Sequence, residues 1–170
     1  KVFKALMGPK TAAYADHVEL TEIKFLEDTE LDIGRDFASA VGTGGVIGTK
    51  FTWPGGPDEV RLTPEKETHW KKWIDIYNDK MLSKGAYLNL YDIAYDQPEA
   101  HTIRKGDTLY YAFYANSWDG DISLRGLDKK RYRIHDYVED RDLGEVIGPE
   151  TTFYATFTDY LLIECIPGEN

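Results

Sequence analysis

The spacing of the hydrophobic positions changes once along the chain, at Gly85. Over residues 64–84 the apolar residues recur every three or four positions, which is typical of a helix with one buried face. Pro64 suits the first turn of such a helix, and Gly85 suits its end. We therefore predict a helix over residues 64–84, whose buried stripe consists of Trp70, Trp73, Ile74, Tyr77 and Met81.

After Gly85, apolar and polar residues alternate in short runs, which is typical of strands that bury one face. The predicted strands cover residues 87–95, 108–115, 121–127, 131–138, 151–157 and 160–166. Turn signals separate the runs at residues 105–106, 119–120, 127–128 and 148–149. This regular spacing predicts an antiparallel β-sandwich, in which the acidic run 139–145 is a solvated loop.

The first half of the chain has a less regular pattern. Strands are predicted at residues 1–7 and 46–53, with a long loop and a short helix near residues 31–40 between them. A strand, an excursion, a second strand and a long amphipathic helix are typical of the closing units of a (β/α)8 barrel. We therefore predict a mixed fold of two domains, an α/β piece at residues 1–85 and the antiparallel β-sandwich at residues 86–170.

Four glycines crowd the stretch "VGTGGVIGTKFTWP", residues 41–54. A dinucleotide-binding loop needs the spacing G-x-G-x-x-G followed by a helix. Here Ile47 takes the third glycine position, and a run with strand propensity follows it. The spacing therefore argues against a phosphate site and favours a tight turn, or a backbone that passes close to a bulky neighbour.

Acidic residues outnumber basic ones by thirty to twenty, so the net charge is −10. This balance disfavours nucleic acid and anionic membranes as partners, because their phosphates would be repelled, and it leaves neutral or cationic ligands. No apolar run approaches the roughly 18 residues of a membrane span. The single cysteine, Cys165, stands among apolar residues. We expect its side chain to be buried, and the cellular compartment stays undetermined.

The densest group of polar side chains follows the first predicted strand, where Asp16, His17 and Glu19 stand within four positions. In a loop at a strand end these side chains can hydrogen-bond a polar ligand, although Asp16 can equally cap the loop itself. The other three histidines stand in separate elements without ligand spacing, so we expect no metal and no cofactor. No serine or cysteine stands in a nucleophile motif, and no catalytic residue is predicted.

The order of the segments resembles the C-terminal end of α-galactosidase (melibiase) type glycoside hydrolases, as in family 36 and its relatives. The resemblance covers nearly the whole chain. It is carried by "MGPKTAAYADHVELT", "RDFASAVGTGGVIGTKFTWP", "EKETHWKKWIDIYNDKMLSKGAYLNLYD" and the strand-rich tail. It implies that residues 1–8 and 40–53 are the seventh and eighth barrel strands, and that residues 64–84 are the last barrel helix.

The resemblance also implies a function. The chain would be the C-terminal portion of an α-glycosidase acting on terminal α-linked sugars of oligosaccharides. Both catalytic aspartates would lie upstream of residue 1, so the chain itself would be inactive and structural. Its partners would be a carbohydrate and the preceding part of the same protein, with Asp16, His17, Gly44 and Gly45 contacting the sugar.

The alternative is a free-standing carbohydrate-binding or interaction module. Exposed aromatic rings stack on sugars, and the chain has twelve tyrosines and four tryptophans. The alternating pattern places many of these rings in the interior, which counts against the alternative.

Overall fold

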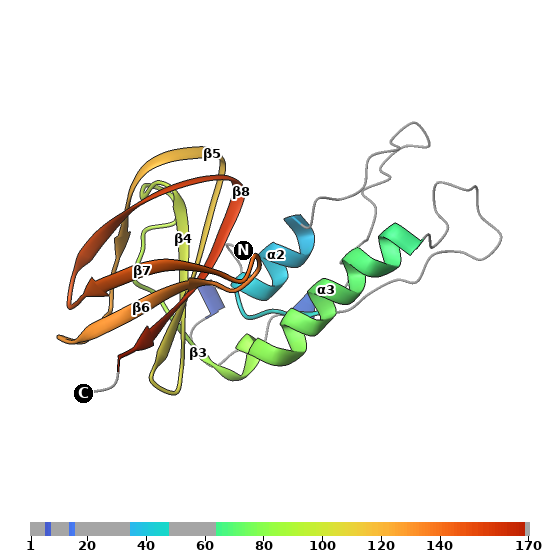
Figure 1. Cartoon of the computed structure of the whole chain (residues 1–170), viewed down its shortest axis with the longest axis horizontal. Helices are drawn as coiled ribbons and strands as arrows, with labels where there is room; N and C mark the ends of the chain where they lie inside the picture. Colours follow the sequence, from blue (N-terminus) through green and yellow to red (C-terminus); the bar gives the residue numbers. More distant parts are fainter. Residues whose placement is uncertain (1–5, 8–13, 16–34, 48–63, 169–170) are drawn as a thin grey trace.

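A six-stranded antiparallel sheet dominates the computed structural model, which describes residues 6–7, 14–15, 35–47 and 64–168 (Figure 1). The strand order is β3-β4-β5-β8-β6-β7. These strands are β3 (Ala86–Leu88), β4 (Glu99–Lys105), β5 (Thr108–Leu124), β6 (Arg131–Asp136), β7 (Arg141–Ile147) and β8 (Thr151–Pro167). The helices α2 (Arg35–Gly42) and α3 (Pro64–Lys80) lie beside one face of the sheet (Figure 1). Two short strands, β1 (Tyr14–Ala15) and β2 (Val46–Ile47), form a separate parallel pair.

Strands β5 and β8 are each 17 residues long and pair with each other along their whole length, apart from one bulge. Side chains from both halves of this pair enter one hydrophobic cluster, which includes Tyr111, Phe113, Ile122, Leu124, Ala155, Leu161 and Ile163. The sheet therefore bends around this cluster, as the curved course of β5 and β8 shows (Figure 1). The predicted antiparallel β architecture is confirmed, while the described residues show no barrel.

The opposite face of the sheet packs against the two helices. Trp73 of α3 is 1% exposed, stacks on Phe37 of α2 at 6.0 Å between ring centroids, and meets Tyr160 of β8 edge-on at 5.7 Å. The sheet contributes Ala112 and Leu162 to the same cluster. The predicted helix is confirmed over Pro64–Lys80, with its buried stripe turned to the core. It ends earlier than expected, because Met81 adopts a left-handed conformation and the 3-10 turn η2 (Leu82–Lys84) follows.

The glycine run marks the end of α2 and its closest approach to the sheet. A Cβ atom on Gly42 would collide with Tyr114 Oη and would lie 2.6 Å from Ala112 Cβ. Gly44 has φ +68°, a conformation that glycine adopts without strain. Its N–H donates to Val41 O at 3.0 Å, and the N–H of Gly45 donates to Ala40 O at 2.8 Å. This pair of hydrogen bonds closes the helix as a Schellman cap. The sequence predicts either a tight turn or a close contact with a bulky neighbour for the glycine run; the structure shows both, and the neighbour is the sheet.

Replacing Gly42 by alanine should lower the free energy of unfolding by about 1–3 kcal/mol, because the added methyl group overpacks the contact between α2 and the sheet. Denaturant titration measures the loss. Gly120→Ala is the matched control, since a Cβ there would meet only Trp118 atoms at 3.9–4.0 Å. Equal stability of the two variants would show that α2 moves away from the sheet at no cost.

Several expected boundaries in the first half are wrong. Leu6 and Met7 are helical, so residues 1–7 do not form one strand. Residues 40–42 belong to α2 rather than to a strand over 40–53, because Ala38 and Ala40 favour a helix that the glycines then cap. The short helix predicted near residues 31–40 is confirmed from Arg35 onward. Residues 48–53 lie outside the described residues, and the division into domains at Gly85 stays a prediction.

Several expectations about the strands are also wrong. The strand predicted over residues 87–95 ends at Leu88, and the N–H of Tyr95 donates to Asp92 O in a turn. The acidic run 139–145 mostly belongs to β7, a strand at the sheet edge, where exposed polar side chains replace the alternating pattern. Asp119 and Gly120 do not turn the chain, because they continue β5 and pair with β8. The sequence analysis predicts no strand at β4.

The other three turn signals do separate strands. Cys165 is fully buried as expected, and burial raises the pKa of its thiol to about 12.

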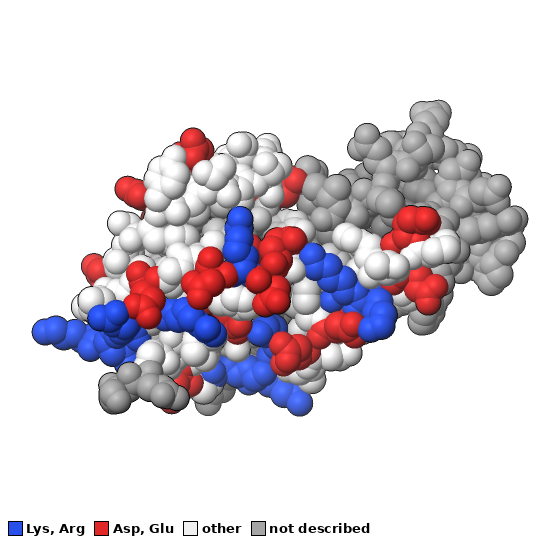
Figure 2. All heavy atoms as spheres, in the orientation of Figure 1, with Lys and Arg blue, Asp and Glu red and all other residues white. Residues whose placement is uncertain are grey.

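Charged side chains of both signs are interspersed over α3 and the β6–β7 hairpin on the face shown in Figure 2. Exposed pairs on these elements include Lys72 with Glu139 at 3.0 Å and Arg131 with Glu145 at 2.6 Å. Such pairs contribute little to stability because water and salt screen them. Among the helices of the described ranges, none has the length and apolar character needed to cross a membrane.

Candidate functional site

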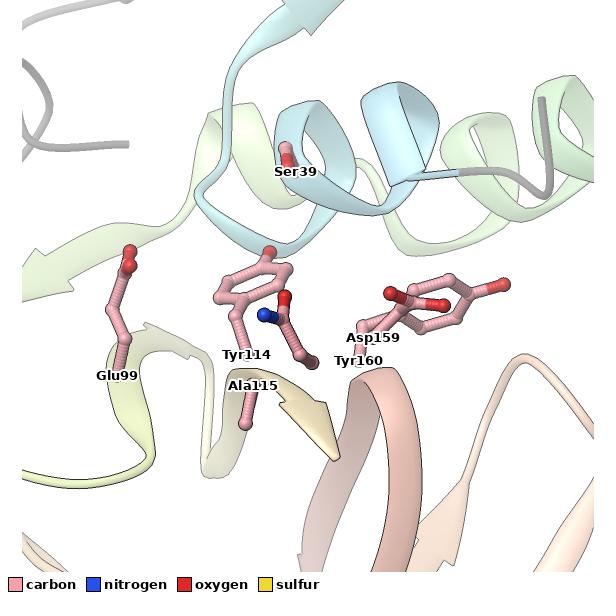
Figure 3. A pocket seen from close by; sticks show the side chains of 7 residues that line it. Ser39, Glu99, Tyr114, Ala115, Asp159 and Tyr160 are labelled. Carbon is pink, nitrogen blue, oxygen red and sulfur yellow. The ribbon is translucent and has the colours of Figure 1, made fainter. Parts of the chain in front are cut away.

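A polar pocket lies between α2 and the end of the sheet where β4 begins (Figure 3). Its volume is about 240 Å³. Four segments, from α2, β4, β5 and β8, supply its described lining, which consists of Ser39, Glu99, Tyr114, Ala115, Asn116, Asp159 and Tyr160. The helix side is tied to the sheet by the Tyr114 hydroxyl, which donates to Ala38 O at 2.8 Å. The pocket therefore depends on the packing of α2 against β5.

A β-bulge directs two of the lining side chains into the pocket. Ala115 pairs with Asp159, and Trp118 pairs with Phe157. Between these two pairs, β5 has two residues, 116 and 117, whereas β8 has only residue 158. Asn116 is one of these two. Asp159 adopts φ +65°, which is uncommon for a residue with a side chain. Bulges re-aim side chains next to functional sites, and strained backbone concentrates there. Both features meet at this pocket.

A chain of hydrogen bonds through the buried His101 fixes another polar group of the pocket, Glu99. Glu99 Oε1 lies 2.8 Å from Nε2 of His101, and Nδ1 of His101 lies 2.6 Å from the Tyr87 hydroxyl. His101 is fully buried. Burial, reinforced by the charge of Glu99, raises the pKa of Tyr87 to about 12, so its hydroxyl stays protonated. A hydroxyl that donates to Nδ1 and an Nε2–H that donates to Glu99 give each group a partner.

The chemistry of the pocket is that of a hydrogen-bond acceptor. Among the described lining residues, the ionisable groups other than tyrosine are the carboxylates of Glu99 and Asp159, and the Asn116 carboxamide and the Ser39 hydroxyl add neutral polar atoms. Figure 3 shows Glu99, Asp159 and the Tyr114 ring along the sheet side of the pocket, opposite Ser39 on α2. In the part of the chain that the structure describes, no group of three or more His, Cys, Asp or Glu side chains could hold a metal ion.

A second polar cluster joins the C-terminal end of α3 to the sheet. Lys80 Nζ lies 3.0 and 3.1 Å from the carboxylate oxygens of Glu164. Glu164 Oε1 also lies 3.0 Å from Nδ1 of His135, whose Nε2 lies 3.0 Å from Asp140 Oδ1. Burial lowers the pKa of Lys80, but the hydrogen bond and charge of Glu164 raise it more, so it lies above its usual value. Through Glu164, which is largely buried, this cluster anchors the end of α3 to β6 and β8.

Of the sequence-predicted site residues, the structure describes Gly44 and Gly45, and neither is among the described residues that line this pocket. Asp16 and His17 lie outside the described residues. Gly44 and Gly45 cap α2, and their predicted contact with a sugar stays a prediction. Glu99, Asn116 and Asp159 were not singled out from the sequence. The only available signal was the alternation in "EAHTI", which places Glu99 and His101 on one face of a strand.

Comparisons with known proteins first give the class of fold. No protein-family model matches the chain. A family 27 β-L-arabinopyranosidase from Geobacillus stearothermophilus superposes with a TM-score of 0.62 and 14% identity, over 93% of this chain and 38% of that one. A putative α-N-acetylgalactosaminidase from Bacillus halodurans gives 0.58 and 11%, over 89% and 38%. An Anoxybacillus α-amylase gives 0.59 and 11%, over 92% and 38%. The chain therefore shares its fold with parts of glycoside hydrolases of differing specificity.

One curated relative has a higher sequence identity to this chain than these structures. The "A type blood alpha-D-galactosamine galactosaminidase" of Flavonifractor plautii is 34% identical over 175 residues, which is 98% of this chain. The chain spans only 14% of the length of that relative. Together, the comparisons support a relationship to glycoside hydrolases of the galactosidase type and do not single out family 36.

Proposed function

We propose that the chain is the C-terminal portion of a glycoside hydrolase acting on terminal α-linked sugars of the galactose type. The observation that carries the proposal is the 34% identity to the galactosaminidase along 98% of this chain. In this proposal the chain is not the catalytic part. Its sheet and α3 support the preceding domain, and the catalytic aspartates lie upstream of residue 1.

The 170-residue chain should therefore fail to hydrolyse nitrophenyl α-galactosaminide, α-N-acetylgalactosaminide and α-galactoside. A longer natural protein that contains this chain should hydrolyse at least one of the three. The measurement is release of nitrophenol under initial-rate conditions. Turnover of order 1 s⁻¹ by the chain alone would overturn the non-catalytic role. Loss of that turnover in Glu99→Gln or Asp159→Asn would then locate the acid pair in the pocket.

A free-standing carbohydrate-binding module is the second candidate, and an exposed aromatic side chain favours it. Tyr154 is 65% exposed, and its hydroxyl donates to Asp119 at 2.6 Å, which holds the ring in one orientation on β8. A fixed, exposed ring suits stacking on a sugar. Retention of the chain on insoluble polysaccharides, lost in Tyr154→Ala, would favour the module over a structural portion of an enzyme.

A further inference from the structure

An apolar groove lies beside the loop between β3 and β4, and its apolar lining includes Leu6, Leu90, Tyr91, Ile93 and Ala94. We propose that an apolar surface of the protein preceding residue 1 docks into this groove. The inference rests on the proposed function only in that further protein precedes residue 1. It needs no catalytic activity, so it stands or fails separately from hydrolysis.

The shape of the groove suits a protein surface rather than a small ligand. Its volume is about 720 Å³, which is large enough for several side chains. Leu6 and Ala94 line it and are both exposed, so the groove is open to solvent. A small-molecule site instead encloses most of its ligand. The occupant is therefore a surface that lies across the groove.

Exposed apolar side chains gather at this groove. Five large hydrophobic residues of the described ranges are exposed, and the two most exposed are Tyr95, at 83%, and Leu6, at 79%. Met7 follows Leu6, and Tyr95 stands between two lining residues of the loop. The other two, Ile147 and Tyr154, lie on β7 and β8. Apolar side chains that are exposed together mark an interaction surface.

Arg125 orders the loop that carries this surface. Its guanidinium group donates to Leu90 O at 3.1 Å and to both carboxylate oxygens of Asp96, at 2.7 and 3.0 Å. The same group lies over the ring of Tyr91, 4.8 Å from the ring centroid. Within the loop, the N–H of Asp96 donates to Asp92 O at 2.7 Å. A surface that is already ordered loses little conformational entropy when it is covered.

The position of Leu6 identifies the occupant. Protein that precedes residue 1 joins this chain five residues before Leu6, and five residues span at most about 18 Å. Such a tether keeps the preceding part at a high effective concentration next to the groove. A separate protein would instead lose its translational freedom on binding. The chain spans only 14% of the curated relative, so that relative has the additional sequence that this contact needs.

The test is hydroxyl-radical labelling read by mass spectrometry, which measures the exposure of individual side chains. It compares the 170-residue chain with a longer natural protein that contains it. Leu6 and Tyr95 should be labelled at least about fivefold more slowly in the longer protein, because docking removes them from water. Tyr154, which is 65% exposed on β8, is the matched control and should be labelled equally in both proteins. Equal labelling of Leu6 and Tyr95 in the two proteins, or protection of Tyr154 as strong as theirs, would overturn the proposal.

A variant of the longer protein locates the contact. Ala94→Asp places a charge in the groove at an exposed position, and it should raise the labelling of Leu6 about fivefold. Thr152→Asp, at an exposed position of β8, is the matched control and should leave that labelling unchanged. Unchanged labelling in Ala94→Asp would contradict the assignment of the groove.

Two further measurements separate the remaining outcomes. Protection of Leu6 that grows with the concentration of the 170-residue chain would identify a second copy as the occupant and would refute the proposal. Hydrolysis of the nitrophenyl glycosides is measured on the same longer protein. Protection without hydrolysis supports the groove contact and counts against the proposed function, whereas hydrolysis without protection does the reverse.

Discussion

Replacing Glu164 by alanine should lower the free energy of unfolding by about 3–5 kcal/mol, which is the range for removing one partner of a buried ion pair. Only 8% of the Glu164 side chain and 18% of the Lys80 side chain are exposed. Without the carboxylate, the ammonium group of Lys80 loses its buried partner, and Nδ1 of His135 loses its acceptor. Chemical denaturation followed by tryptophan fluorescence measures the change, because Trp73 lies on the helix that this cluster anchors.

The control for Glu164 is an exposed ion pair of the same sheet. Glu145→Ala removes the partner of Arg131, where 53% and 63% of the two side chains are exposed, and should cost less than about 1 kcal/mol. Replacing Lys80 and Glu164 together by methionine and leucine should restore much of the stability, since no buried charge then remains. If Glu164→Ala lowers the free energy of unfolding as little as Glu145→Ala does, water reaches the ammonium group of Lys80 freely.

Replacing Trp73 by alanine should also cost about 3–5 kcal/mol, the range for truncating a buried aromatic side chain. Trp73 is 1% exposed and lies between the rings of Phe37 and Tyr160. Its removal leaves a cavity where α2, α3 and the sheet meet, so all three layers lose contacts. Thermal and urea denaturation, read by circular dichroism, measure the loss.

Lys71→Ala is the control for Trp73, because Lys71 stands on the same helix with 72% of its side chain exposed. The control should stay within about 0.5 kcal/mol of the parent protein. If Trp73→Ala also stays within that margin, α3 contributes little to the core, and the helix and the sheet unfold independently.

The sequence predicts those helices and strands in which apolar residues repeat at a regular short spacing. The stripe of α3 and the inner strands alternate clearly, because one side of each is buried. The sequence predicts a loop where β7 forms, because an edge strand does not need one buried face. The continuity of β5 through Asp119 and Gly120 depends on its pairing with β8. No local signal distinguishes that pairing from a turn.

The candidate site was harder to predict than the fold. Ser39, Glu99, Asn116 and Asp159 meet only through the tertiary structure, and the bulge that turns two of them inward depends on the register between β5 and β8. The resemblance predicts sugar contacts in the first loop and the glycine run, and these contacts stay predictions. The spacing of the glycines predicts a turn and a close backbone contact, and both occur at the end of α2.

The place of β8 in the strand order governs how the protein can be assembled during translation. β8 is the last described strand to leave the ribosome, yet it lies between β5 and β6 and bonds to both. Until it emerges, the β3–β4–β5 meander and the β6–β7 hairpin each present an open edge that can pair with other chains. A translation product that ends before β8 therefore lacks the strand that joins the two halves, and both unpaired edges stay open.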